Sequence, residues 1–468
     1  MSATLPKDVA QDIWAKDRQH FVHPWTHFDS FKEEGSLVMH QAEGVYTVDA
    51  EGNRYLDGVG GLWCVNIGYG REEMAEVVAE QTLKLAYANP FVDVTNAPAA
   101  KLAAKLAELA PGSLNHVSFA GGGSTANETA FRLIQYYWGC KGEKNRKHFL
   151  SRKGSYHGST YITQSLTGKP ADRQPEFEYA TDFIHHVAEP NVYRRPRDMD
   201  EEAFTDFLIA DFKGKLEELG ANNVAAFFAE PILGAGGVVV PPQRYVEAVH
   251  KLCKSHGIVF VSDEVVTGFG RLGAWFASKD VFNIQPDIIT CAKGLTSGYQ
   301  PLGATIFSDQ IYDVISAKGH DRWFTNGYTY SGHPVACASA LKNIEIMERE
   351  NLLDHVKNDV GPYFMQKLNE LRDMPTVGDV RGKHLMACVV NVGNKETRET
   401  LPDEVNIGKR ISNAAEKRGL LVRPVGNLNV LSPPLTITRT QIDELVTILR
   451  DSMSEVVTDL QKQGISIN

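Results

Sequence analysis

Residues 223–264, "NVAAFFAEPILGAGGVVVPPQRYVEAVHKLCKSHGIVFVSDE", contain two short apolar runs on either side of a helix-length segment. The runs "NVAAFFAE" and "GIVFVSDE" are short and rich in apolar residues, which predicts two buried strands. The segment "RYVEAVHKLCKSHG" between them predicts a helix. A strand, a helix and a second strand in this order favour a parallel pair within one sheet.

The same alternation extends from about residue 72 to residue 310. Helical text such as "APAAKLAAKLAELA" is interleaved with the apolar runs "HVSFA", "KHFLS" and "DIITCAK". Strands separated by helices predict a mostly parallel sheet that is covered by helices on both faces. We therefore expect an α/β fold with a large domain over residues 72–333.

The two chain ends carry smaller units. "GVYTVDAEGNRYLDG" predicts a hairpin, and "LLVRPVGNLNVLSPPL" predicts further strands. Two helices are expected in "VNIGKRISNAAEKRG" and "TRTQIDELVTILRDSMSEVV", the second capped by Thr438 or Thr440. We expect residues 1–71 and 334–468 to form a smaller α+β domain together.

Composition excludes several classes of function. The chain of 468 residues has a formal charge of −10 and no dense stripe of lysine and arginine, so a nucleic-acid partner is not expected. It has no apolar run of about 18 residues that would span a membrane, and its first residues do not resemble a signal peptide. Six scattered cysteines without a CxxC pair predict reduced thiols and a cytoplasmic protein.

A metal site is not expected at His20, His23 and His27. Pro24 interrupts any helical face that these histidines would share, and no thiol or carboxylate stands at ligand spacing. This segment is interpreted as an ordinary N-terminal stretch.

Ionisable residues stand at the ends of three predicted core strands. "NVAAFFAE" ends at Glu230, "GIVFVSDE" at Asp263 and Glu264, and "DIITCAK" at Lys293. One such residue is explained by solvent at a strand end. Several of opposite charge predict a shared pocket, because ligands of open α/β sheets bind beyond the carboxyl ends of the strands. A buried structural ion pair between Lys293 and Asp263 is the alternative.

A glycine loop precedes one predicted helix in "FAGGGSTANETAFRLIQYYW". Glycines allow an anion to approach the backbone, and a helix N-terminus offers free N–H groups. The loop lacks both GxxxxGK[ST] and GxGxxG, so a single phosphate fits better than a nucleotide. A simple tight turn is the alternative.

A phosphate site, a buried lysine and a buried acid together match the needs of pyridoxal phosphate. The lysine forms a Schiff base with the aldehyde, and the acid keeps the pyridine nitrogen protonated. An aromatic side chain must also hold the ring, and "SYHGST" supplies Tyr156 and His157. A nicotinamide dehydrogenase would give Lys293 no role, and a non-catalytic binding protein would leave it idle.

The chain resembles the class III aminotransferases, pyridoxal-phosphate enzymes of fold type I. The resemblance rests on "GGGSTANETAFRL", "YHGST", "AEPILGAGGVVVPP", "SDEVVTGFGRLG", "CAKGLTSGYQPLG" and "NGYTYSGHPVACA". Within this family, "LDGVGGLWCVNIGYG" and "LVRPVG…SPPL" are most similar to the ω-amine:pyruvate branch.

The resemblance implies roles for individual residues. Lys293 is the Schiff-base lysine and proton shuttle, and Asp263 is the partner of the pyridine nitrogen. Cofactor contacts are further implied for Gly123, Ser124, Tyr156, His157, Glu230, Val265 and, on the phosphate of a neighbouring subunit, Thr329. Substrate contacts are implied for Trp63, Phe91, Tyr156, Ala235 and, toward a carboxylate, Arg423. Thr125 stands where the family more often has glutamate.

From residue type alone, some of these side chains have structural alternatives. Trp63 and Phe91 are also typical of core aromatics, Tyr156 of a loop anchor, and Arg423 of a structural ion pair.

The activity implied is the transfer of an amino group from an ω-amino compound to pyruvate by a ping-pong mechanism, giving an aldehyde or ketone and alanine. Donors considered are taurine, β-alanine, a diamine or a simple amine. A homodimer with shared active sites is expected, with a tetramer as the larger option. The alternatives are a decarboxylase, an aminomutase, and an aminotransferase that uses 2-oxoglutarate.

Overall fold

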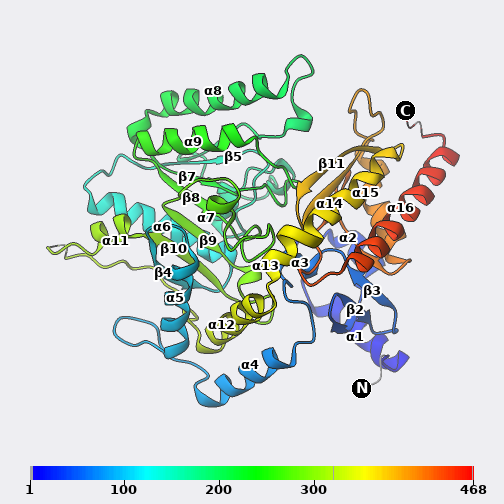
Figure 1. Ribbon diagram of the computed structural model, residues 1–468, viewed down its shortest axis with the longest axis horizontal. Coiled ribbons are helices and arrows are strands. Elements are labelled where there is room, and N and C mark those ends of the chain that lie inside the picture. Colours follow the sequence, from blue (N-terminus) through cyan, green and yellow to red (C-terminus); the bar gives the residue numbers. More distant parts are fainter. Residues whose placement is uncertain (1–3, 320, 466, 468) are drawn as a thin grey trace.

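The computed structural model describes residues 4–319, 321–465 and 467. Residues 1–3, 466 and 468, which belong to the predicted small domain, and residue 320 of the predicted large domain lie outside this description. A seven-stranded sheet in the order β4-β10-β9-β8-β7-β5-β6 lies between helices in the left half of the molecule as Figure 1 shows it. Its strands are β4 (Leu114–Ala120), β5 (His148–Arg152), β6 (Ile184–Val187), β7 (Val224–Ala229), β8 (Val259–Asp263), β9 (Ile288–Cys291) and β10 (Gly303–Ser308).

The expectation of a mostly parallel sheet is confirmed, with one strand reversed. β6, β5, β7, β8 and β9 pair in parallel, whereas β10 pairs antiparallel with both β9 and β4. A short segment with a single turn of 3-10 helix (Lys293–Leu295) joins β9 to β10. A parallel return would need a longer crossover, usually through a helix, so the chain turns back antiparallel.

Both faces of the sheet are buried. Phe227 of β7 and Phe260 of β8 share a core with helices α8 (Glu201–Leu219) and α9 (Gln243–Ser255). The next residues along the strands, Phe228 and Val261, share the opposite core with α6 (Gly123–Cys140). Successive side chains of a strand point to opposite faces, so an uninterrupted apolar run serves both layers.

Two four-stranded sheets are built from the chain ends. One has the order β1-β2-β3-β13 and the other β11-β12-β15-β14. β13 pairs in parallel with β3, which joins the C-terminal third of the chain to its beginning. The strands are β1 (Met39–Glu43), β2 (Tyr46–Asp49), β3 (Arg54–Asp57), β11 (Val377–Lys383), β12 (Met386–Asn391), β13 (Leu420–Leu421), β14 (Arg423–Val425) and β15 (Leu428–Leu431).

Local predictions for the chain ends hold. β2 and β3 form the expected hairpin, and the helices appear as α15 (Ile407–Glu416) and α16 (Arg439–Lys462). Thr438 caps α16 by accepting a hydrogen bond from the backbone N–H of Gln441. The other helices are α1 (Lys7–His20), α2 (Phe28–Glu34), α3 (Gly60–Trp63), α4 (Glu72–Lys84), α5 (Ala97–Leu109), α7 (Tyr161–Leu166), α10 (Ala277–Asp280), α11 (Asp309–Ile315), α12 (Pro334–Arg349), α13 (Leu352–Asp354) and α14 (Gly361–Asn369).

α12 packs against α4 and α5, at the edge of the large sheet (Figure 1). α12 was assigned to the small domain, but it packs on two helices of the large domain. The domain division at residues 71/72 and 333/334 stays a prediction. Within the described residues, no helix combines the length and apolarity that crossing a membrane requires.

Candidate active site

The carboxyl ends of β7, β8 and β9 bring the predicted ionisable residues to one edge of the sheet. These strands are adjacent and parallel, and they deliver Glu230, Asp263 and Lys293 in turn. Lys293 is half-buried and has a φ of +46°, a left-handed backbone conformation that is costly for a side-chain-bearing residue. Burial lowers the pKa of Lys293, and Asp263 is the leading charge that opposes this shift.

Asp263 is buried and accepts three hydrogen bonds. His157 donates from Nδ1 at 2.8 Å, Asn127 from Nδ2 at 2.7 Å and the Val265 backbone N–H at 3.2 Å. Within the described chain no ion pair joins Lys293 to Asp263, which pairs with His157 instead. These three hydrogen bonds fix the orientation of the Asp263 carboxyl group beside the lysine.

Asn127 was not found by sequence reasoning. Besides Asp263, its amide group contacts the His157 backbone carbonyl at 2.8 Å and accepts from Thr290 Oγ1 at 2.8 Å. It lies on the buried face of α6 next to Ala126 and Ala130. The signal in the sequence that could have identified Asn127 is a polar amide on an otherwise apolar helix face.

The glycine loop forms the N-terminus of α6. The Gly122 N–H donates to Thr125 Oγ1 at 3.1 Å, and the Thr125 hydroxyl donates to the Gly122 carbonyl at 3.0 Å. Thr125, the departure from the family pattern, therefore closes the first turn of the helix. Ser124 Oγ accepts from the Ser159 N–H at 3.1 Å, which fixes it beside the loop that follows β5.

Val265 contacts this loop. A Cβ on Gly123 would lie 2.9 Å from Val265 Cγ1, so only glycine fits at this position. The structure thus brings Gly123, Ser124 and Val265 together at the end of the site where a helix N-terminus offers free N–H groups.

Glu230 connects two loops of the site. Its carboxylate accepts from the backbone N–H of Tyr156 at 2.9 Å and from that of Gly234 at 2.8 Å. Burial raises the pKa of Glu230. The residue holds the loop after β5 and the loop after β7 in register, and so positions Tyr156.

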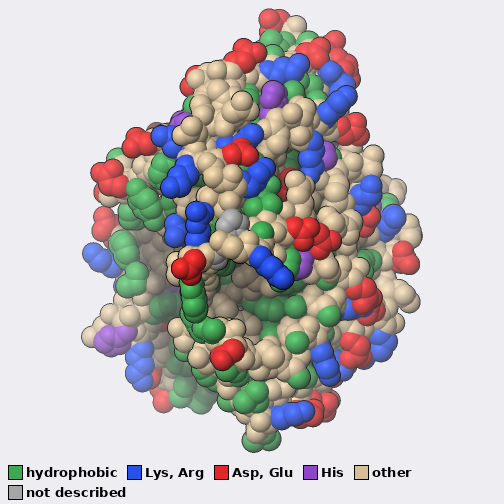
Figure 2. Space-filling view, turned by 90° about the vertical axis from the view of Figure 1, so that its left-hand side faces the viewer, with side chains coloured by type: hydrophobic (Ala, Val, Ile, Leu, Met, Phe, Trp, Pro, Cys, Tyr) green, Lys and Arg blue, Asp and Glu red, His purple; other side chains and the backbone are tan. Residues whose placement is uncertain are grey.

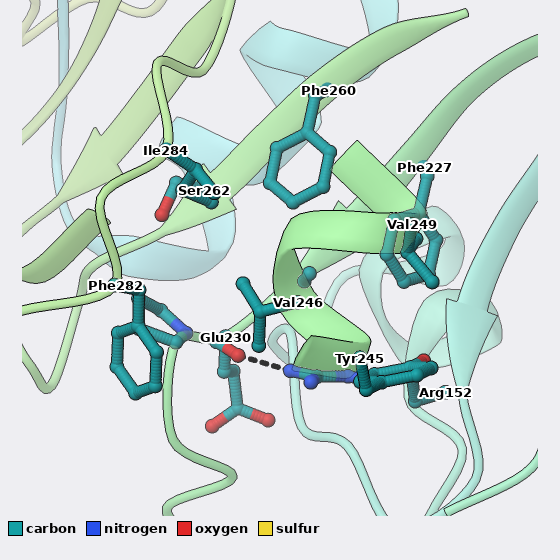
Figure 3. A pocket seen from close by; sticks show the side chains of 12 residues that line it. Arg152, Phe227, Glu230, Tyr245, Val246, Val249, Phe260, Ser262, Phe282 and Ile284 are labelled. Atoms are coloured by element: carbon teal, nitrogen blue, oxygen red, sulfur yellow. Dashed lines mark hydrogen bonds between the residues drawn. The ribbon is translucent and has the colours of Figure 1, made fainter. Parts of the chain in front are cut away.

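Arg152 contacts Glu230 and was also missed by the sequence analysis. It is fully buried at the end of β5 and donates from Nη2 to the Glu230 backbone carbonyl (Figure 3). Both residues line a small cavity of about 20 Å³ together with Tyr245. Arg152 was missed because a lone arginine at the end of an apolar run is typical of a solvated strand end. Its burial results from tertiary packing.

Trp63 and Arg423 lie side by side, and the segment that carries Ala235 packs against Trp63 through Gly234. A Cβ on Gly234, the neighbour of Ala235, would collide with Cζ3 of the buried Trp63 ring. The Arg423 guanidinium lies 6.0 Å from the centre of the same ring. Within the described chain no ion pair joins Arg423 to an acid; burial lowers its pKa, and the charges of Tyr156 and Asp172 oppose this shift. Arg423 is thus a half-buried cation beside the Trp63 ring.

Phe91 and Thr329 are placed elsewhere. Phe91 is exposed and lines a cavity of about 790 Å³ whose walls include Gly327 but none of Trp63, Tyr156, Ala235 and Arg423. Thr329 is exposed, and its carbonyl accepts from the Tyr87 hydroxyl at 3.0 Å. Figure 2 looks onto the face from which these loops project, and this face is hollowed and carries hydrophobic side chains. Within one chain, neither residue joins the other site residues.

The N-terminal histidines have structural contacts. His23 Nε2 lies 2.9 Å from Asp17 Oδ1, and His27 caps α2 by accepting from the Ser30 N–H. His20 is the exposed last residue of α1. No group of three or more potential metal ligands occurs among the described residues.

Comparison with known proteins agrees with this geometry. The sequence model of the class III aminotransferases matches residues 30–453. The chain belongs to the class III aminotransferases. A putrescine–pyruvate aminotransferase of Pseudomonas aeruginosa is 40% identical over 455 residues, covering 97% of this chain and 98% of that protein. A diaminobutyrate–2-oxoglutarate transaminase of Halomonas elongata is 35% identical, covering 97% and 98%.

Solved structures share the whole fold. A thermostable (S)-enantioselective ω-transaminase from Thermomicrobium roseum superimposes with a TM-score of 0.92 at 42% identity, covering 97% of this chain and 99% of that one. An ω-transaminase from Pseudomonas jessenii, solved in complex with PMP, gives a TM-score of 0.91 at 32% identity, covering 95% and 98%. The fold is that of the type I pyridoxal-phosphate enzymes, as the sequence predicted.

The residues present fit pyridoxal 5'-phosphate, the cofactor of this class. An amine, a fixed carboxylate and a glycine loop at a helix N-terminus match its aldehyde, its ring nitrogen and its phosphate. His157 contacts Asp263 through Nδ1, and its Nε2 is buried without a hydrogen-bond partner in the described structure, so one polar atom of this cluster remains unsatisfied. The protein is a pyridoxal-phosphate-dependent aminotransferase.

Proposed function

We propose that this aminotransferase moves an amino group from a terminal amine or ω-amino acid to pyruvate, giving an aldehyde or ketone and L-alanine. The observation that carries the proposal is the half-buried Arg423 beside the Trp63 ring, near an amine and a carboxylate at the sheet edge. The similarity to a putrescine–pyruvate aminotransferase and to ω-transaminases supports the same branch of the family.

Lys293 is the proton carrier of this proposal. When bound, the cofactor supplies an electron sink for the carbon that loses its proton. Lys293 Nζ takes that proton and returns it at the neighbouring position, which requires a neutral amine. Its burial lowers the pKa and favours the neutral form.

Asp263 and its partners hold the ring end of the site. His157 and Asn127 fix the position of the Asp263 carboxylate. In this position it would keep a proton on the ring nitrogen of the bound cofactor. Tyr156, which Glu230 holds, and Val265 would hold the ring, and Gly123 and Ser124 would hold the phosphate.

Arg423 recognises the acceptor. A guanidinium forms two parallel hydrogen bonds to a carboxylate, and pyruvate carries one next to its reacting carbon. Trp63 and Ala235 limit the space for the rest of the substrate.

The active unit is a homodimer in this proposal. Phe91 and Thr329 belong to an exposed, hollowed and largely apolar face, and contiguous apolar surface of this kind is typical of protein interfaces. Across a two-fold axis they reach the partner's site, where Thr329 contacts phosphate. Thr329→Ala should retain the cofactor less well, which the absorbance of the bound cofactor measures. An active, cofactor-loaded wild-type monomer in sedimentation experiments would refute the shared site.

The donor and acceptor are tested by incubating the cofactor-loaded protein with amines and either pyruvate or 2-oxoglutarate. We expect alanine from pyruvate and little glutamate from 2-oxoglutarate. Glutamate as the main product would place the protein with its 2-oxoglutarate-dependent relatives. Carbon dioxide release, or a rearranged amine without a keto acid, would indicate a decarboxylase or an aminomutase.

A further inference from the structure

A second cavity, of about 800 Å³, opens beside Tyr156. Its walls come from residues 23–28, from α7 and the residues preceding it, and from Ala171, Asp172, Gln174, Phe177 and Glu178. The Trp25 ring centre lies 6.1 Å from that of Tyr156, and the Tyr156 hydroxyl hydrogen-bonds Ser159 Oγ at 3.0 Å. Trp25 and Ser159 both line the cavity, so it adjoins the residue proposed to stack on the cofactor.

The walls of this cavity are acidic and aromatic. They contain the carboxylates of Asp172 and Glu178 and no lysine or arginine, while four rings, Trp25, Phe28, Tyr161 and Phe177, are exposed. Aromatic faces attract organic cations and carboxylates pair with them, so the lining suits a cation that carries hydrocarbon.

Asp172 is the fixed acid of the cavity. It is 6% exposed, and its backbone carbonyl accepts from Gln164 Nε2 at 2.7 Å. Its Oδ1 accepts from Lys169 Nζ at 2.8 Å, whereas Oδ2 has no partner in the part of the chain that is described. Lys169 does not line the cavity. One oxygen of a buried carboxylate thus remains available to a ligand.

We propose that this cavity binds the distal ammonium group of a diamine donor, and that Asp172 determines this specificity. The inference rests on the proposed aminotransferase function. It adds a binding site for the end of the donor that lies farthest from the reacting carbon. Trp25 and Phe177 contact the methylene chain, and Asp172 Oδ2 accepts a hydrogen bond from the distal ammonium. Lys169 competes for the same carboxylate and weakens the preference.

The test compares α,ω-diamines, from propane to hexane, with the monoamines of equal length, using pyruvate and the cofactor-loaded protein. The measured quantity is the ratio of kcat/KM for diamine to that for monoamine. Asp172→Asn should lower this ratio about tenfold, the size of one lost hydrogen bond between charged groups. Lys169→Met should raise it, and the matched control Glu176→Gln, an exposed acid outside the cavity, should leave it unchanged.

The two opposite shifts separate recognition from damage to the fold, because misfolding would not raise the ratio in Lys169→Met. An Asp172→Asn ratio equal to that of Glu176→Gln would overturn the inference. Alanine formation from monoamines in the same assays would then still support the proposed function, and no alanine from any amine would sink that function itself. A changed sedimentation coefficient in Asp172→Asn with an unchanged ratio would also overturn the inference, by assigning the cavity to a second copy of the chain.

Discussion

The floor and the outer wall of the site are built differently. On the floor, Asp263 and His157 are buried and hydrogen-bonded at the ends of core strands. On the wall, Trp25 and Phe177 are exposed and lie on connecting segments, and Arg423 comes from a short strand near the other end of the chain. The floor is fixed by the packing of the sheet, whereas the wall is made largely of exposed side chains. We infer that the floor determines the reaction and the wall determines the substrate.

The largest effect should follow the loss of Lys293. Lys293→Ala should lower transamination on the order of a thousandfold or more, because no other amine carries the proton. Lys251→Ala, an exposed lysine on α9, is the matched control and should keep full activity. Turnover near the wild-type rate in the Lys293 variant would show that the floor does not control the reaction.

Asp263→Asn should lower the rate on the order of a hundredfold while the cofactor still binds, because a neutral amide cannot hold the ring nitrogen protonated. Cofactor content from absorbance and steady-state rates separate the two effects. An undiminished rate would refute the electron-sink role of Asp263.

Arg423→Ala should act on one half-reaction only. We expect the pyruvate half-reaction to slow by roughly tenfold to a hundredfold, as a bidentate contact to the carboxylate is lost. The half-reaction with an uncharged amine should change little, and a donor with its own anionic end should lie between the two. Single-turnover measurements follow each half-reaction, and equal losses in both would assign Arg423 to the fold.

The smallest effect concerns stability. Burial lowers the pKa of Lys293 below its ordinary value of 10.5. Between the lowered pKa and 10.5 the unfolded chain binds more protons than the folded one, so the free energy of unfolding of the cofactor-free protein should rise with pH in that window. Lys293→Met removes this contribution. Its stability advantage, measured by urea unfolding, should shrink as the pH approaches 10.5, and a constant difference would contradict a buried charge.

Local signals in the sequence predicted most of the fold. Residues close together in the chain determine the apolar strand runs, the hairpin of β2 and β3, and the Thr438 cap. The reversal of β10 was missed because strand direction depends on the length of the connection, which periodicity does not report.

The site was predictable where residues follow strand ends, as for Glu230, Asp263 and Lys293. Asn127 and Arg152 were missed because their roles arise from contacts with residues far away in the sequence, Asp263 and Glu230 respectively. Phe91 and Thr329 were assigned to the site by resemblance, and a single chain does not bring them there. Their roles remain predictions that a second chain must complete.

The most direct test of the central claim follows the absorption of the cofactor-loaded protein through the two half-reactions. An amine donor added without pyruvate should remove the visible absorption of the lysine-bound cofactor and release one equivalent of carbonyl product per site. Pyruvate added next should restore the absorption and release one equivalent of alanine. Absorption that persists with every amine, or that returns without alanine, would contradict an amine:pyruvate aminotransferase built around Lys293.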